Sequence, residues 1–106
     1  MMAESDFAGL KINKVIHERA RLLILSYLAG SETGKATFME LQKAMDLSRG
    51  NLSIQIKTLQ QAGYVSITKR FKDNKPQTTI LLTETGQKAI NEYLKAMQQI
   101  LEKMKY

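Results

Sequence analysis

The sequence predicts a mainly α-helical domain that carries one small β-hairpin, in the α+β class. Two observations support this. Apolar residues recur at helical spacing in four segments, whereas the residues between 64 and 82 alternate as strands do on either side of a turn. The chain has 106 residues, fewer than the ~150 of an average domain, so we expect a single domain over residues 1–106.

The first predicted helix spans residues 14–28, where apolar side chains recur near helical spacing, and Gly30 is placed to cap its end. A brief strand is expected at residues 36–37. Thr37 and Glu40 fit a capping box, in which the hydroxyl accepts from the Glu40 amide and opens a second, short helix.

The third predicted helix runs from Arg49 to Ala62, with Ser48 as its N-cap and Gly63 as its stop. At about 100° per residue, three apolar side chains share its inner face: Leu52, Ile56 and Leu59. The opposite face is polar, except for Ile54.

The hairpin follows, with its turn at residues 73–76. Pro76 has no amide hydrogen, so it suits an edge or the tip of the hairpin. Thr83 then caps the last helix, residues 84–105. At 1.5 Å per residue this helix is about 33 Å long, which is longer than the core requires.

The basic residues are concentrated in one part of the chain. The formal charge of +6 comes from 16 Lys and Arg against 10 Asp and Glu. Residues 1–48 carry six basic and six acidic groups, whereas residues 49–76 carry six basic groups and one acidic group. Such a block predicts a polyanionic partner. The alternative is a basic surface that serves solubility alone.

Several classes of site are excluded. The chain has no cysteine and a single histidine, His17, so we expect no disulfide, no metal site and no thiol nucleophile. No nucleophile motif or glycine-rich phosphate loop is present, so we predict a protein that is not an enzyme and needs no cofactor. The acidic N-terminus and the absence of a long apolar run predict a cytoplasmic protein without membrane contact.

Two short helices, a tight turn and a basic hairpin form a winged helix-turn-helix arrangement. Four segments resemble small MarR/ArsR-type transcriptional regulators in order and spacing: LLILSYL at 22–28, FMEL and LSRGNLS at 38–41 and 47–53, LQQAGYV at 59–65, and LTETG at 82–86. The resemblance implies double-stranded DNA as the partner, with the helix-turn-helix at about 37–62, the wing at about 64–82 and a dimerisation helix at about 84–105.

The third helix is the predicted recognition helix, because a helix fits the DNA major groove with its N-terminal end nearest the bases. We expect its contacts from seven residues: Ser48, Arg49, Gly50, Asn51, Ser53, Ile54 and Lys57. Arg49 suits guanine or a phosphate, Asn51 suits adenine, and Ile54 suits a thymine methyl. In the alternative, Ile54 packs against a neighbouring element and Arg49 is solvated.

The wing supplies four further predicted DNA contacts: Lys69, Arg70, Lys72 and Lys75. Basic side chains on a hairpin lie along the DNA backbone or enter the minor groove. The MarR-like pattern has Asp-x-Arg at this tip, whereas this chain has Asp73-Asn74-Lys75. Lysine keeps the charge but loses the planar fork of arginine, which weakens the expectation of minor-groove recognition. A solvated turn is the alternative.

The last helix carries a heptad seam. We expect seven of its residues to pack on a second copy of the chain: Ile90, Tyr93, Leu94, Met97, Ile100, Leu101 and Met104. The segment at residues 7–15 is a second candidate contact. Such a homodimer would place two recognition helices about one DNA turn apart. In the alternative, the seam is a core stripe within one chain.

The leading hypothesis is a homodimeric, sequence-specific, double-stranded-DNA-binding transcriptional regulator. A second hypothesis is a winged helix that acts as a protein-interaction module in a larger complex, with the heptad helix as its docking surface. A third makes the dimer cleft a sensor of a small-molecule effector, which the sequence does not identify.

Overall fold

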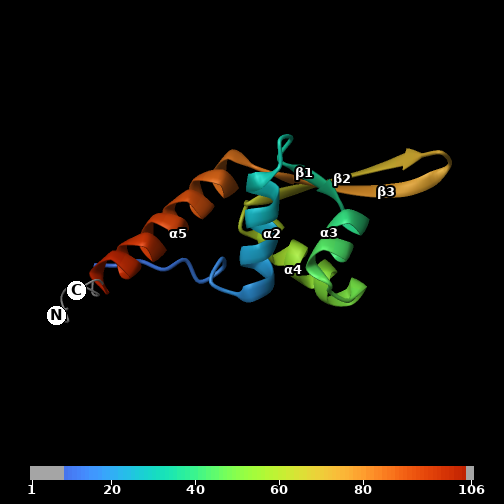
Figure 1. Cartoon of the computed structure of the whole chain (residues 1–106). Coiled ribbons are helices and arrows are strands. Elements are labelled where there is room, and N and C mark those ends of the chain that lie inside the picture. The colour runs from blue at the N-terminus through green and yellow to red at the C-terminus, as the bar shows by residue number, and fades with distance from the viewer. Residues whose placement is uncertain (1–8, 105–106) are drawn as a thin grey trace.

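The computed structural model describes residues 9–104, and Figure 1 shows their arrangement. The elements follow one another as α2 (Arg19–Gly30), β1 (Lys35–Thr37), α3 (Phe38–Met45), α4 (Arg49–Gln61), β2 (Val65–Lys72), β3 (Lys75–Leu82) and α5 (Glu84–Lys103). This order confirms the predicted α+β architecture, with a helix-turn-helix, a hairpin and a long last helix.

The sheet has three antiparallel strands in the order β1-β3-β2. Ile80 of β3 lies between Ala36 of β1 and Ile67 of β2. Asp73 and Asn74 both have positive φ, 52° and 63°, as a two-residue turn of type I′ requires. The turn is therefore shorter than predicted, and β3 already begins at Lys75.

The core lies where α2 meets α4, α5 and the sheet. Its largest side chains without solvent exposure come from six segments of the chain: Ile16, Ile24, Leu25, Leu28, Leu41, Leu52, Leu59, Ile80 and Ile90. The predicted inner face of the third helix is confirmed, since Leu52 and Leu59 are completely buried and Ile56 nearly so. α2 supplies three of the nine residues and therefore forms the centre of the core.

Three helices begin at the hydroxyl caps that the sequence predicts. Thr37 Oγ1 accepts from the Glu40 amide at 3.1 Å, Ser48 Oγ from the Asn51 amide at 3.1 Å, and Thr83 Oγ1 from the Gly86 amide at 3.0 Å. Each bond satisfies a backbone amide that has no partner within its helix. The caps thus fix the starts of α3, α4 and α5.

The predicted bounds of the first helix are wrong at both ends. It begins at Arg19 rather than residue 14, because Asn13 Oδ1 accepts from the amides of Val15 and Ile16 and so forms a turn. Glu18 is the actual N-cap. At the other end Gly30 is still helical, and the chain leaves the helix at Ser31 in an extended conformation.

The base of the hairpin is packed tightly against the start of α5. Thr83 Oγ1 donates to the Gly63 carbonyl at 2.6 Å, and the Thr83 amide donates to the Tyr64 carbonyl at 3.1 Å. A Cβ at Gly86 would overlap the Tyr64 carbonyl oxygen, so this position requires glycine. We call this contact the hairpin–α5 junction.

The hairpin and α5 project from the core in opposite directions (Figure 1), and the molecule measures 60 × 25 × 23 Å along its principal axes. α5 contains 20 residues. Within residues 9–104, neither it nor any other helix is apolar enough over sufficient length to cross a membrane.

Candidate nucleic-acid interface

Helix α4 separates an apolar face from a polar one. Its inner face is buried in the core, whereas its outer face is open to solvent. All seven residues predicted to contact DNA from this part of the chain are exposed: Ser48, Arg49, Gly50, Asn51, Ser53, Ile54 and Lys57. Ile54 is 64% exposed, so it does not pack against a neighbouring element.

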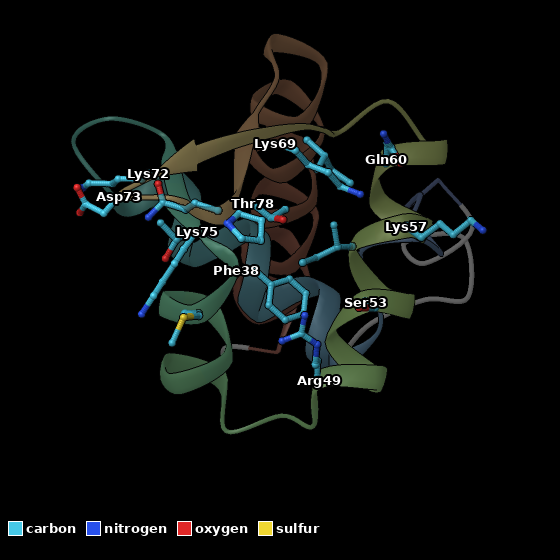
Figure 2. Close-up of a pocket in the computed structure, with 16 residues that line it drawn as sticks. Phe38, Arg49, Ser53, Lys57, Gln60, Lys69, Lys72, Asp73, Lys75 and Thr78 are labelled. Carbon is cyan, nitrogen blue, oxygen red and sulfur yellow. The ribbon is translucent and has the colours of Figure 1, made fainter.

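The N-terminal end of α4 is held by the start of α3. The guanidinium carbon of Arg49 lies 5.5 Å from the centre of the Phe38 ring, within the range of a cation–π contact. Ser48 contributes its hydroxyl as the cap of α4. Arg49 is therefore positioned by an aromatic surface, and its N–H donors point toward the space beside the helix (Figure 2).

A groove of about 770 Å³ runs between α4 and the hairpin, with the start of α3 along one side (Figure 2). Five of its lining residues are cationic: Arg49, Lys57, Lys69, Lys72 and Lys75. Asp73 is the one acidic residue among its lining residues. Phe38, Ile56 and Ile67 give it an apolar floor. A cationic groove of this kind suits a phosphate backbone.

The hairpin divides the four predicted wing residues between its two faces. Residues paired across antiparallel strands share a face and alternate along each strand. Lys69 and its partner Thr78 lie on one face, whereas the pairs Arg70–Gln77 and Lys72–Lys75 lie on the other. Lys69, Lys72, Lys75 and also Gln77 line the groove, but Arg70 does not, so the groove takes in residues of both faces. The structure therefore brings three of the four together with Arg49, Ser53 and Lys57.

Four of the predicted recognition residues lie outside this groove. Ser48, Gly50, Asn51 and Ile54 are exposed at the start and on the outer face of α4 but do not line it. The candidate interface thus has two parts. One is the cationic groove, and the other is the exposed face of α4, whose polar and apolar side chains match base edges in chemistry.

Two features of the surface around the interface were not predicted from the sequence. Phe71 is 80% exposed on β2, where the strand pattern alone predicts an ordinary alternating residue. The second feature is a chain of hydrogen bonds from Arg21 through Gln55 to Asn51. For Phe71, the one sequence signal is an aromatic residue near Pro76 in an otherwise polar hairpin tip. No local sequence signal indicates the hydrogen bonds from Arg21 through Gln55 to Asn51.

The predicted dimer surface on α5 needs a correction. Ile90 is completely buried and Tyr93 is 4% exposed, both within this chain's own core. The Tyr93 hydroxyl also lies 2.8 Å from His17 Nδ1. These two residues belong to the core of one chain, so they are not available to contact a second copy.

The rest of the predicted seam is accessible. Leu94, Leu101 and Met104 are 52%, 64% and 57% exposed, and Met97 and Ile100 are half-buried. In the second predicted contact, residues 7–8 lie outside the described residues. Further along that segment Ile12 is 38% exposed, whereas Val15 packs against the core.

The comparisons with known proteins agree with this fold. The family model of winged helix DNA-binding domains matches residues 20–101, from α2 to the distal part of α5. An uncharacterized protein of Methanocaldococcus jannaschii is 29% identical over 87 residues, which make up 82% of this chain and 92% of that protein.

Two solved structures show the same fold. The transcriptional regulator homologue protein from Pyrococcus horikoshii OT3 is similar with a TM-score of 0.84 at 24% identity, over 96% of this chain and 99% of that one. A MarR family transcriptional regulator from Streptomyces coelicolor, in complex with DNA, has a TM-score of 0.69 at 21% identity. That match covers 81% of this chain and 54% of the regulator. The predicted winged-helix fold is thereby confirmed.

Proposed function

Because this chain belongs to the winged helix DNA-binding domain family, we propose that it is a transcriptional regulator that binds double-stranded DNA sequence-specifically as a homodimer. One observation carries the proposal. Five cationic side chains converge on a groove directly beside the exposed face of α4, so backbone contacts and base contacts come from adjacent surfaces.

In the proposed complex α4 enters the major groove, with its N-terminal end nearest the bases. Arg49 then reaches a guanine edge or a flanking phosphate, and Ile54 contacts a thymine methyl. The hairpin follows the sugar-phosphate backbone, which occupies the cationic groove. There Lys69, Lys72 and Lys75 neutralise phosphates and add affinity without reading sequence.

The proposed dimer forms through the distal half of α5. Leu94, Leu101 and Met104 are exposed along one helix that extends beyond the core (Figure 1). Burial of such side chains is favourable by about 25 cal/mol per Å² of apolar surface. A second copy offers the same stripe in return, as a two-fold symmetric interface requires.

Selection of bound sequences from a random double-stranded pool, followed by fluorescence anisotropy over a salt series, tests the proposal. We expect enrichment of a pseudo-palindromic site and a steep fall of affinity with salt. Arg49→Ala should lower affinity for the selected site by about tenfold or more, whereas Lys88→Ala, on the exposed surface of α5, serves as the matched control.

Two results would contradict the proposal: no enriched sequence, or binding that does not depend on salt. A monomeric mass in solution together with a stable protein partner would instead favour the interaction-module hypothesis.

A further inference from the structure

A chain of hydrogen bonds connects α2 to the outer face of α4. Arg21 Nη1 donates to Gln55 Oε1 at 2.7 Å, and Gln55 Nε2 donates to Asn51 Oδ1 at 3.0 Å. Arg21 itself lies away from the cationic groove and is only 18% exposed in its side chain. A largely buried cation in α2 is thus connected by two hydrogen bonds to an exposed residue on α4.

The position of Arg21 is fixed by two further contacts. Its Nε donates to the Val15 carbonyl at 2.6 Å, and Nη1 lies 3.8 Å from Glu18 Oε2. The guanidinium is planar, so these contacts set the direction in which Nη1 meets Gln55. A charged donor also makes the bond to Gln55 stronger than a bond between two amides.

The chain of bonds has only one possible polarity. A guanidinium has donors and no acceptor, so Gln55 must turn its oxygen toward Arg21. Its nitrogen then faces Asn51, which has to accept through Oδ1. Asn51 Nδ2, which carries two donor hydrogens, is the part of the amide that no side chain or backbone group within residues 9–104 engages.

We infer that Arg21 acts through Gln55 as a positioning residue, so that Asn51 presents a hydrogen-bond donor to DNA and selects guanine. This inference rests on the proposed function, because it concerns the base that faces α4. Guanine offers two acceptors and no donor on its major-groove edge, thymine offers one acceptor, and cytosine offers a donor there. Pairing with adenine also needs the asparagine oxygen as an acceptor, and here that oxygen is turned toward Gln55.

The decisive variant is Gln55→Glu, which reverses the polarity without removing the contact to Arg21. A carboxylate still accepts from the guanidinium but has no hydrogen to give to Asn51. Asn51 then turns its nitrogen toward position 55 and its oxygen toward the DNA. The preference at the base that Asn51 faces should change from guanine to a base with an exposed donor, cytosine or adenine.

The readout is the sequence selected from a random double-stranded pool at one salt concentration. Selection with Asn51→Ala first identifies the half-site position that this residue contacts. At that position we expect the ratio of guanine to cytosine to change by about tenfold or more between the wild type and Gln55→Glu.

Three controls separate polarity from charge and folding. Gln61→Glu adds the same charge to the exposed face of α4 outside the chain of bonds and should lower affinity without changing the preferred base. Gln55→Met puts a side chain without a hydrogen-bond donor at this position, so it should weaken the preference for guanine without reversing it. Glu18→Gln removes the ion pair but leaves both bonds in place, so its selected site should match the wild type.

The outcomes are distinguishable. If the wild type enriches no sequence, the proposed function and this inference both fail. If the wild type enriches a site but Gln55→Glu keeps guanine at the Asn51 position, or changes no more than Gln61→Glu does, the proposed function stands and the inference is overturned. Adenine at that position in the wild-type site would overturn it as well.

Discussion

The hairpin and the distal half of α5 both extend from the same core, at opposite ends of the molecule (Figure 1). They differ in the chemistry of what they expose. The hairpin tip carries Lys69, Arg70, Lys72 and Lys75 against one acidic residue, Asp73. The last helix exposes three apolar side chains instead: Leu94, Leu101 and Met104.

This difference teaches that the shape of a projection does not identify its partner. Binding of a row of cations to a polyanion is favoured by the release of counterions. Binding of an apolar stripe to a similar surface is favoured because both surfaces are removed from water. Substitutions at the two ends should therefore change different measured quantities, and substitutions at the junction between them should change both.

The largest effect is expected at the hairpin–α5 junction. Gly86→Ala places a methyl group against the Tyr64 carbonyl and the Leu82 side chain, so it should lower the free energy of unfolding by about 3 kcal/mol, at the upper end of overpacking costs. Chemical denaturation measures this. Gly30→Ala is the matched control, because its Cβ would meet nothing within 4 Å; equal stability of the two variants would refute the steric argument.

Substitutions at the apolar end should change the molecular mass in solution rather than the stability of the fold. Leu101→Glu should give a monomer in light scattering, since a carboxylate at a 64%-exposed position costs the single chain little but opposes burial in a dimer. Glu102→Gln, at the neighbouring exposed position, controls for a surface substitution. An unchanged dimeric mass of Leu101→Glu would place the dimer contact elsewhere.

Substitutions at the cationic end should change how strongly the affinity for DNA depends on salt. Removing both Lys72 and Lys75 by alanine substitution should reduce the slope of log affinity against log salt by about 0.9 for each phosphate that is no longer neutralised. Affinity should fall alike for the selected site and for unrelated DNA, because these residues contact the backbone. Anisotropy titrations at several salt concentrations measure the slope, and a change of preferred sequence would contradict a backbone role.

The smallest effect concerns Glu18, the N-cap of α2. Burial raises the pKa of this carboxyl, but hydrogen bonds from the amides of Arg21 and Ala20, together with the charges of Arg21 and Arg19, outweigh it and lower the pKa overall. A lowered folded-state pKa stabilises the fold at neutral pH, and this stabilisation is lost as the pH falls through that value.

Glu18→Gln should therefore cost about 0.3 kcal/mol at pH 7, a small amount because the carboxylate is one-third exposed. The difference from the wild type should shrink between pH 7 and the acidic range, as the pH falls through the lowered pKa of Glu18. Thermal unfolding of both proteins across this range measures it. A difference that grows as the pH falls would have the opposite sign and would refute the assignment.

Much of the fold could be predicted from local signals. Thr37, Ser48 and Thr83 open their helices as their hydroxyl chemistry predicts, and the exposed position of Ile54 follows from helical periodicity. The start of the first helix could not be predicted, because the Asn13 side chain forms a competing turn with nearby amides, an outcome that apolar spacing does not encode.

The errors in the candidate site have a common physical cause, because each depends on packing between distant segments. A three-and-four spacing is the same whether a helix rests on its own core or on a second chain, so Ile90 and Tyr93 could not be told from Leu94 and Leu101. The bond between Arg21 and Gln55 joins residues 34 positions apart.

The tight junction at Gly86 also has a consequence for the DNA. In the proposed dimer, the direction in which α5 leaves the hairpin base sets the distance between the two recognition helices. The hairpin–α5 junction therefore fixes that distance. Adding one base pair between half-sites turns one of them by about 34–36° around the duplex. A packed junction has little freedom to follow that rotation, so the spacing of the half-sites becomes part of what the protein recognises.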